Sequence, residues 1–525
     1  MDGISRLTHR QIWHGARCLC LLAGLSTEAV IALVSMAPAA RAAVINVVDV
    51  IPNSDSSETF QNSEPSLGVN PLDPSQMIAG TFGSGTPYFK SINGGAIWSD
   101  YGNLSTVDKS IAWRQDGVAG LTATLAFTGV GNNTQISTFS GTVAGSNFGA
   151  PINVFNPAQF LDQPWIRTGP SGQTYETYNH LGNTGGRTAS IRVSSDNGAT
   201  FATPITLETV NPAAGQDAPS VRQAANGSTV YAAFTRWGTP SAVTGGTLFP
   251  GSQVVVVKST NSGGSFSTGA SAATTTGYFA NASNTPVTLG QERTSSDLAI
   301  AVDPNNANHV VVVYGNVPGP GQLQLNVVES TDGGMTWSAS KFTTPLNVRS
   351  ALPGVSILAN GDVGLLYAQY DFVTNQLSQH LLTTSDDFVT TSDTLLGAQS
   401  NASPGIQFHP YLGDFYDLTS VDDTLYGIFS ASNADNGILA SYPDATFQRD
   451  FTGIVGSASF QLTSLNGAPV PFSIDPFFFS VNLAVPEPAT LTLLGASLLG
   501  FAVLYGWWPR RKYSYRWTGK QGSDV

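Results

Sequence analysis

The octapeptide Ser330-Thr-Asp-Gly-Gly-Met-Thr-Trp337 is one of four copies of a short pattern, Ser-x-(Asp/Asn)-x-Gly-x-x-(Trp/Phe). The other copies are Ser91–Trp98, Ser194–Phe201 and Ser259–Phe266, and a weaker relative is Thr384-Ser-Asp-Asp-Phe388. In such a pattern an Asp or Asn side chain caps the amides of a turn, Gly permits a positive φ, and the aromatic residue packs beneath the turn. Each copy therefore predicts a clasped hairpin that fastens two strands, and not a catalytic site.

A pair of apolar strands joined by a turn precedes each clasp, as in Pro65–Val69 and Met77–Phe82. Such units recur roughly every sixty residues, which is enough for four short strands and their turns. Radial stacking of four-stranded units is a β-propeller. We therefore predict an all-β fold with one propeller over residues 43–484, of seven blades or alternatively six, closed by Val44–Val50 and Phe477–Leu483 sharing a blade. An array of β-sandwiches is the main alternative, but it would not repeat the clasp at one place in each unit. The units are expected to begin near Glu64, Asp116, Asp162, Asp217, Asp297, Leu352 and Tyr411.

The composition agrees with short strands and tight turns, because Gly (55 residues) and Pro (30) are plentiful and charged residues are only 11%. Without its two terminal segments the body carries a net charge of −18. An acidic body repels nucleic acid, so neutral or cationic partners or bound cations are favoured, unless the charge serves solubility alone. The two cysteines, Cys18 and Cys20, lie in the predicted leader. Cysteine catalysis and cysteine metal sites in the body are therefore excluded.

The first 42 residues are typical of a signal peptide. Arg6, Arg10 and Arg17 give a positive start, apolar stretches follow, and Ala40-Arg41-Ala42 fits a cleavage site. A membrane anchor is the alternative, but the apolar stretches are short and Glu28 interrupts them. The sequence therefore predicts export of the body.

The other end predicts a transmembrane helix over residues 489–508. This run is uncharged, is roughly 30 Å long as a helix, and precedes the basic cluster Arg510-Arg511-Lys512. The positive-inside rule places residues 513–525 in the cytoplasm and the body outside. Directly before the run stands the motif Pro486-Glu487-Pro488.

Residues 485–512 resemble the PEP-CTERM sorting signal of Gram-negative bacteria, which combines a Pro-Glu-Pro box, a membrane helix and a basic end. The resemblance implies that an exosortase-type membrane protease processes the tail near the box, and that the protein accompanies exopolysaccharide production. The protein would be held at the membrane by the C-terminal helix before processing and lie at the cell surface or in the extracellular matrix afterwards. An ordinary C-terminal anchor is the alternative, and it would not require Pro486-Glu487-Pro488.

The clasps resemble the Asp boxes, or BNR repeats, of the sialidase superfamily. Ser194–Phe201 and Ser330–Trp337 match the full Ser-x-Asp-x-Gly-x-Thr-(Trp/Phe) form, whereas the other two copies carry Asn in place of Asp. The resemblance implies a sialidase-like propeller but says little about chemistry, because Asp boxes also occur in other propellers. It assigns structural roles to Ser91, Asn93, Gly95, Trp98, Ser194, Asp196, Gly198, Phe201, Ser259, Asn261, Gly263, Phe266, Ser330, Asp332, Gly334 and Trp337.

A sialidase would show further features that are missing here. That family binds the substrate carboxylate with an Arg triad and uses a Tyr nucleophile with a Glu partner. Its first Arg normally lies in a Phe/Tyr-Arg-Ile-Pro motif, which this sequence lacks, and the early Arg114 does not match it. The spacing also selects no nucleophile among Tyr411, Tyr416 and the pair Tyr175-Glu176.

Acidic residues lie at or just before most predicted inner strands, and arginines accompany them. Such a ring can bind a polar sugar through bidentate Arg contacts and carboxylate hydrogen bonds, or it can tie blades together as ion pairs. The candidates for acid and base are Asp116, Asp162, Asp217, Asp297 and Asp414, and those for substrate binding are Arg114, Arg167, Arg222, Arg293 and Arg349.

The sequence indicates no cofactor. The histidines have no metal-ligand spacing, and calcium at acidic turns is an unspecific alternative; the histidines in question are His180, His309, His380 and His409. Our leading hypothesis is an exported, surface-sorted propeller that binds extracellular polysaccharide or another glycan. A glycoside hydrolase with a carboxylate pair at the propeller mouth is the first alternative, and a structural matrix protein is the second.

Overall fold

The structure is a computed structural model that describes residues 45–181, 187–210, 220–243, 246–280, 297–319, 321–400, 412–433, 445–452 and 461–483. These residues are almost entirely β-strand and turn, apart from two short 3-10 turns at Asn53–Asp55 and Pro170–Gly172. The predicted signal peptide and the predicted transmembrane helix lie outside the described residues. Within them, no helix has the length and apolar character needed to cross a bilayer.

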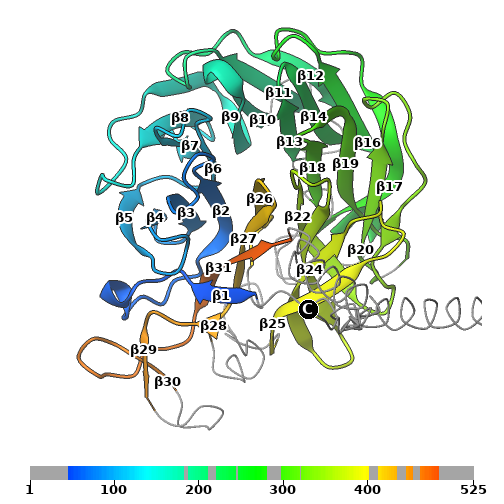
Figure 1. The fold of residues 1–525 in the computed structure, drawn as a ribbon. Coiled ribbons are helices and arrows are strands. Elements are labelled where there is room, and N and C mark those ends of the chain that lie inside the picture. Colours follow the sequence, from blue (N-terminus) through cyan, green and yellow to red (C-terminus); the bar gives the residue numbers. More distant parts are fainter. Residues whose placement is uncertain are drawn as a thin grey trace, which may run out of the picture. The chain divides into compact units, whose positions relative to one another are not determined.

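The strands form antiparallel sheets that follow one another around a ring (Figure 1). One seven-stranded sheet comprises two of these units, because its 16-residue strand β9 leaves one unit as the outermost strand and enters the next as the innermost. Counted in this way, the described residues form seven blades. The predicted all-β propeller is therefore confirmed, with seven blades rather than six.

The first three blades are built from consecutive strands. Blade 1 contains β2 (Ser63–Val69), β3 (Met77–Phe82), β4 (Thr86–Ser91) and β5 (Ser99–Leu104); blade 2 contains β6 (Lys109–Trp113), β7 (Gly120–Phe127), β8 (Thr134–Gly141) and the first half of β9 (Asn153–Thr168); blade 3 contains the second half of β9, β10 (Thr174–Leu181), β11 (Arg187–Ser194) and β12 (Ile205–Val210).

The next three blades repeat this order. Blade 4 contains β13 (Val221–Asn226), β14 (Thr229–Arg236), β16 (Gly246–Ser259) and β17 (Ala270–Ala280), with the short β15 (Ser241–Val243) beside β16; blade 5 contains β18 (Leu298–Asp303), β19 (Asn306–Asn316), β20 (Gln324–Ser330) and β21 (Phe342–Thr343); blade 6 contains β22 (Arg349–Ile357), β23 (Val363–Asp371), β24 (Gln376–Thr384) and β25 (Ser392–Ser400).

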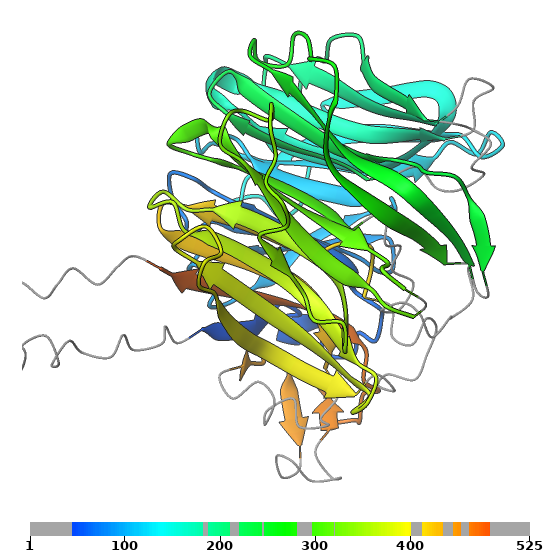
Figure 2. The same ribbon diagram turned by 90° about the vertical axis from the view of Figure 1, so that its right-hand side faces the viewer.

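Blade 7 joins the two ends of the described chain. Its strands are β26 (Asp417–Val421), β27 (Thr424–Ser432), β31 (Ile474–Asn482) and β1 (Asn46–Asp49), with β28 (Ala445–Thr446) pairing parallel to β1. Strand β1 pairs antiparallel with β31, Val47 opposite Phe479. The predicted closure by sharing a blade is thus confirmed. The ribbon of β29 (Asp450–Thr452) and β30 (Gln461–Thr463) projects beyond the ring (Figures 1 and 2).

The first strand of each blade lines a central channel. These inner strands contact one another in the closed order β2, β6, β9, β13, β18, β22, β26 and back to β2. The hydrophobic cores lie between neighbouring blades: one cluster, for example, joins Val311 and Leu325 of blade 5 to Val355 and Leu365 of blade 6. Burial of both faces explains near-continuous apolar runs such as Val310–Tyr314 in β19.

The clasps occupy the turn between the third and fourth strands. In each, the Ser hydroxyl donates to the Asp or Asn side chain and accepts from the backbone amide of the Gly at the fifth position of the pattern. Ser330, for example, bonds Asp332 (2.9 Å) and Gly334 (2.8 Å) in this way. Thr384, Asp386 and the amide of Phe388 repeat these bonds in blade 6, so the weaker relative is a fifth clasp. Blade 7 has no turn at this place because its third and fourth strands come from opposite ends of the chain.

One expected unit boundary is wrong. The sequence suggested that the second unit begins near Asp116, but its inner strand is β6, and Asp116 lies in the turn that follows it. The apolar run of β6, Ile111–Trp113, is short and has polar residues on either side, so it gives a weak strand signal. The longer run Leu121–Phe127 gives a stronger signal but belongs to the second strand, β7.

Candidate functional site

Among the described residues, three inner strands begin with a backbone bulge at the same place. Glu64, Gln163 and Leu352 each have a positive φ (49°, 49° and 59°), each is buried, and each precedes a proline. The strand pairing shifts register at or opposite these residues. A left-handed backbone is costly for residues other than Gly, and a bulge changes the direction of a side chain. The repetition therefore marks the start of the inner strands as a specially shaped part of the channel.

Side chains from blade 3 reach across the channel to blade 7, which is not its neighbour in the ring. The amide of Gln163 donates to Asp414 (3.3 Å), and the guanidinium of Arg167 forms an ion pair with Asp417 (2.9 Å). Between them, the rings of Trp165 and Phe415 meet edge to face with their centroids 4.9 Å apart. The middle of the channel is thus filled by a layer of side chains and is not an open pore.

A carboxyl cluster lies where the inner strands begin. Asp108, directly before β6, shares a hydrogen bond with Asp162, and Asp414 lies near enough to act on it electrostatically. Burial, followed by the negative charges of Asp162 and Asp414, raises the pKa of Asp108 well above its ordinary value. Asp108 and Asp162 therefore form a coupled pair that holds a proton where an isolated Asp would have lost it.

Lys109 brings a positive charge to the same end of the channel. Its side chain is fully buried, and its ammonium donates to the backbone carbonyl of Glu64. Burial lowers the pKa of Lys109 to about 8, although the charges of Glu64, Asp108 and Asp417 oppose this shift. The ammonium partly balances the carboxyl cluster.

Arg222 is the most unusual group in the channel. It is only 3% exposed, and its guanidinium lies 4.1 Å from the centroid of the Trp165 ring and 5.4 Å from that of Phe415. Within the described part of the chain, its two terminal nitrogens have no hydrogen-bond partner. Burial, and next the charge of Arg167, lower the pKa of Arg222 to about 9, so the group is still a cation at neutral pH.

A cavity of about 490 Å³ adjoins these side chains. It extends from the channel arginines along the inner strands β13, β18, β22 and β26, and its walls include Trp165, Arg167, Arg222 and Asp417. Polar side chains such as Gln223, Thr419, Ser356 and Ser420 line the rest of it among apolar residues. This size and this mixture of aromatic, charged and hydroxyl groups suit a small polar ligand or a segment of a longer one.

The structure brings four of the ten predicted site residues together. Asp162, Asp414, Arg167 and Arg222 all lie in the channel. Their role in binding or catalysis remains a prediction. Asp217 and Arg293 lie outside the described residues.

The other four predicted residues are each held by a structural partner of their own. Arg114 and Asp116 form an ion pair with each other in the exposed turn after β6. Asp297 is buried and accepts the backbone amide of Leu352 (2.7 Å), which joins blades 5 and 6. The Nε of Arg349 donates to the carbonyl of Gly321 (2.8 Å). We therefore leave these four out of the candidate site.

The tyrosines considered as nucleophiles are also placed. Tyr416 is buried and donates to the carbonyl of Ser430 (3.0 Å), and Glu176, next to the buried Tyr175, forms an ion pair with Arg192 (2.6 Å) inside its own blade. Tyr411 lies outside the described residues. Neither described tyrosine is presented to the channel as part of a Tyr–Glu pair.

Sequence reasoning missed Asp108, Lys109, Trp165 and Asp417. Because the second unit was placed too late, Asp108 was not recognised as the counterpart of Asp162, although each stands directly before or at the start of an inner strand segment. Asp417 does not stand out in the sequence, because Asp414 already supplies an acidic residue just before the inner strand β26. The signal that would have found Asp108 is its place just before a short apolar run.

Comparisons with known proteins identify the C-terminal segment. Residues 484–511 match the PEP-CTERM protein-sorting motif. No curated protein matches the chain. The chain is therefore a seven-bladed β-propeller that carries a PEP-CTERM sorting motif, which indicates a secreted protein sorted through the membrane.

Several solved structures show a distant likeness in fold. An α-L-arabinofuranosidase of Fusarium graminearum is 10% identical (84% of this chain and 98% of that chain, TM-score 0.38), and an α-L-arabinanase of Penicillium chrysogenum is 11% identical (83% and 98%, TM-score 0.39). An ulvan lyase is 11% identical over 71% of this chain and 92% of that chain, with a TM-score of 0.40. Likeness of this degree assigns neither a substrate nor catalytic residues to this chain.

Proposed function

We propose that this protein is an exported cell-surface or matrix protein whose propeller binds an extracellular polysaccharide in the channel cavity. The observation that carries the proposal is Arg222: a buried guanidinium whose terminal nitrogens lack a hydrogen-bond partner among the described residues, on the wall of a cavity of about 490 Å³.

A buried cation without hydrogen bonds is costly to keep. A ligand that offers oxygens to Arg222 removes this cost, and carboxylate or closely spaced hydroxyl oxygens fit the planar fork of a guanidinium best. Trp165 holds the guanidinium in place from one side, so little order is lost when the ligand binds. The geometry favours a sugar, and among sugars one with a carboxylate.

Replacing Arg222 by Gln should weaken polysaccharide binding by roughly 10- to 100-fold, because hydrogen bonds to a charged group contribute about 1.5–3 kcal/mol. Binding is measured by titration calorimetry of the full-length protein with a carboxylated polysaccharide, alginate, and a neutral one, dextran. The parent is expected to bind alginate more tightly.

The thermal stability of Arg222→Gln separates binding from folding. Because the change removes a buried charge whose terminal nitrogens have no hydrogen-bond partner among the described residues, the melting temperature should stay the same or rise. Arg114→Gln is the matched control, since Arg114 pairs only with Asp116 in an exposed turn among the described residues, and it should bind like the parent. Equal affinities of the two variants would refute the cavity as the binding site.

Hydrolysis of the bound glycan is the second candidate function. It is favoured by Asp108, whose raised pKa suits a general acid, with a carboxylate of the cluster as its partner. Against it, Asp108 and Asp162 share a hydrogen bond, whereas hydrolases hold their two carboxyls about 5–9.5 Å apart with the substrate between them. We therefore place binding before hydrolysis.

Asp108→Asn tests this acid. The pKa of Asp108 is higher in the folded protein than in the unfolded chain. The contribution of Asp108 to the free energy of unfolding is therefore complete below the unfolded pKa and is lost as the pH rises through the folded pKa. The variant cannot ionise, and its melting temperature at pH 7 should exceed that of the parent by a few degrees, the scale set by about 1 kcal/mol. The difference should shrink towards pH 4.

Two results bear on the alternatives for Asp108. A melting temperature at pH 7 that is unchanged or lower would contradict the protonated pair. Release of reducing ends from a labelled polysaccharide by the parent, lost in Asp108→Asn, would put hydrolysis first. Absence of both binding and hydrolysis for alginate, dextran and the matrix polysaccharide of the producing cells would favour a structural matrix protein.

A further inference from the structure

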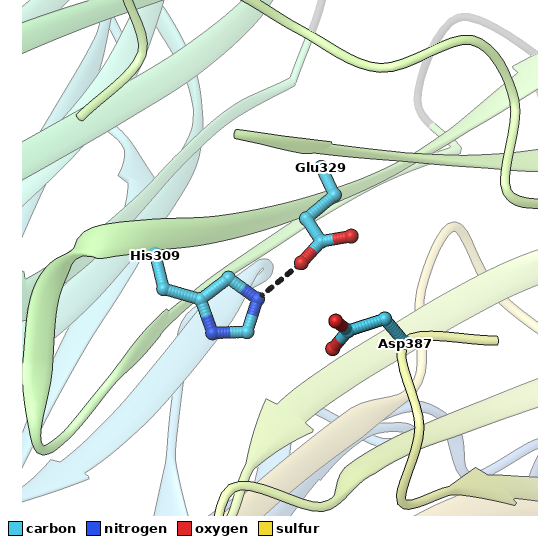
Figure 3. A group of neighbouring side chains, drawn as sticks. All are labelled: His309, Glu329 and Asp387. Atoms are coloured by element: carbon cyan, nitrogen blue, oxygen red, sulfur yellow. Dashed lines mark ion pairs between the residues drawn. The ribbon is translucent and has the colours of Figure 1, made fainter. Parts of the chain in front are cut away.

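A second group of chemically capable side chains lies far from the cavity, between blades 5 and 6. His309 comes from β19, Glu329 from β20, and Asp387 from the fifth clasp, at the turn between β24 and β25 (Figure 3). One nitrogen of His309 and one oxygen of each carboxylate all lie within 4.8 Å of one another. None of the three lines the channel cavity.

The imidazole of His309 is held from behind. Its Nδ1 lies 3.2 Å from Oδ2 of Asp303, the last residue of β18, and His309 is only 8% exposed. This contact fixes the ring and directs Nε2 towards the two carboxylates, as Figure 3 shows. A histidine fixed through Nδ1 by a carboxylate is the usual arrangement of a metal-binding histidine.

The second ring nitrogen, Nε2, faces Oε1 of Glu329, and the carboxylate of Asp387 lies beside this pair (Figure 3). Nε2 of His309 lies 2.8 Å from Oε1 of Glu329, yet it makes no hydrogen bond of acceptable angle within the described residues. An ion between the groups would satisfy Nε2 and Oε1 together.

Glu329 is oriented in the same way as the histidine. Its Oε2 accepts from the ammonium of Lys341 (3.0 Å), which leaves Oε1 facing His309. The carboxylate is almost fully buried, with 4% of its side chain exposed. Two ligands are thus fixed by partners behind them before any ion arrives, which reduces the entropy lost on binding.

Asp387 supplies the third group from the next blade. Its place in the clasp is taken by Gly94, Asn197, Ser262 and Gly333 in the other four, and all five residues have a positive φ. Among the clasps, only this one carries an ionisable side chain there. The following Phe388 is buried in the core between blades 5 and 6, which keeps the exposed Asp387 next to His309 and Glu329.

We propose that His309, Glu329 and Asp387 bind one Zn²⁺ ion that ties blade 5 to blade 6. One imidazole nitrogen and two carboxylate oxygens suit Zn²⁺, which takes N and O ligands at about 2.0–2.2 Å and completes its shell with water. Ca²⁺ prefers six to eight oxygens and fits a site with a nitrogen ligand poorly. The ion braces two blades of an exported domain that contains no cysteine.

The test is a calorimetric titration of the full-length protein, first treated with EDTA, with ZnCl₂ and separately with CaCl₂. The parent should take up one equivalent of Zn²⁺ and melt at a higher temperature when Zn²⁺ is present. Asp387→Asn should bind Zn²⁺ at least tenfold more weakly and lose this rise. The variant should still fold, because Asn197 occupies the same clasp position in blade 3 with a φ of 59°.

Asp422→Asn is the matched control. Asp422 is also an exposed aspartate with a positive φ (51°), in the turn of blade 7, and it lies outside the cluster. It should bind Zn²⁺ like the parent. The proposal is overturned if the parent takes up no Zn²⁺ in a saturable manner, if both variants bind it equally, or if Ca²⁺ binds in its place; His309 would then serve only as an ion-pair partner of Asp303 and Glu329.

Discussion

Arg449→Ala should destabilise the protein by about 3–5 kcal/mol, the usual cost of removing one partner from a buried ion pair. The guanidinium of Arg449 forms ion pairs with Asp49 and Asp475, and all three side chains are fully buried. Asp49 ends β1 and Asp475 lies in β31, so the pairs join the two strands that close the ring. Without Arg449, the carboxylates of Asp49 and Asp475 would remain buried without the cation that balances their charge.

The loss should depend on pH in a defined direction. Burial raises the pKa of Asp49, and the charge of Arg449 opposes that rise. In Arg449→Ala the pKa of Asp49 should therefore rise further, so the variant is least stable, relative to the parent, near neutral pH and recovers as the pH falls and the carboxyls become protonated. Urea unfolding at pH 5 and pH 7.5, followed by circular dichroism, measures both effects.

A surface ion pair provides the control for Arg449. Arg236 pairs with Glu208 at 2.6 Å, but its side chain is 36% exposed, and Arg236→Ala should cost about 1 kcal/mol or less. The triple change Arg449→Met, Asp49→Asn and Asp475→Asn should recover most of the stability, because it removes the buried charges together. If Arg449→Ala lowered the free energy of unfolding by less than about 1 kcal/mol, the ion pairs of Arg449 would not be what holds the ring closed.

Replacing Pro486-Glu487-Pro488 by three alanines should abolish C-terminal processing. The segment 484–511 matches the sorting motif, and we propose that an exosortase-type protease recognises the Pro-Glu-Pro box. The uncharged run 489–508 would still enter the membrane as a helix, so the variant should accumulate there at its unprocessed length. Immunoblots of membrane and released fractions, with an antibody to the propeller, measure the outcome.

Three alanines at residues 517–519, beyond the matched segment, are the control for the tail and should leave processing unchanged. Normal processing of the Pro486-Glu487-Pro488 variant would contradict the sorting role of the box. In that case an ordinary membrane anchor would explain the uncharged run and its basic flank.

The fold was largely predictable because five of the seven blades repeat a local signal. The clasps mark the turn between third and fourth strands, and even the degenerate Thr384–Phe388 forms the same hydrogen bonds as Ser330–Trp337. The boundary that failed lies in blade 2, which has no such clasp: the chain between β8 and β9 is a different turn, so nothing local fixed where that blade begins. Ring closure was predictable because the terminal strands were left without other partners.

The candidate site was only half predictable, because its residues meet through the ring. Asp162 and Arg167 stand out by their places in an inner strand. However, Arg167 pairs with Asp417, and Gln163, next to Asp162, bonds Asp414, and both partners come from a blade that is not a neighbour. The same limit applies to His309, Glu329 and Asp387, which are far apart in sequence and meet only across a blade interface. Spacing along the chain carries no signal for contacts of this kind.

The central claim is that the cavity beside Arg222 holds the glycan. A crystal structure of the protein with an acidic oligosaccharide, prepared by partial hydrolysis of the matrix polysaccharide of the producing cells, tests it most directly. We predict sugar density in the cavity, with a carboxylate or hydroxyl pair within hydrogen-bond distance of the terminal nitrogens of Arg222. Density confined to the outer strands of the blades, with the terminal nitrogens of Arg222 still without a hydrogen-bond partner, would contradict the claim.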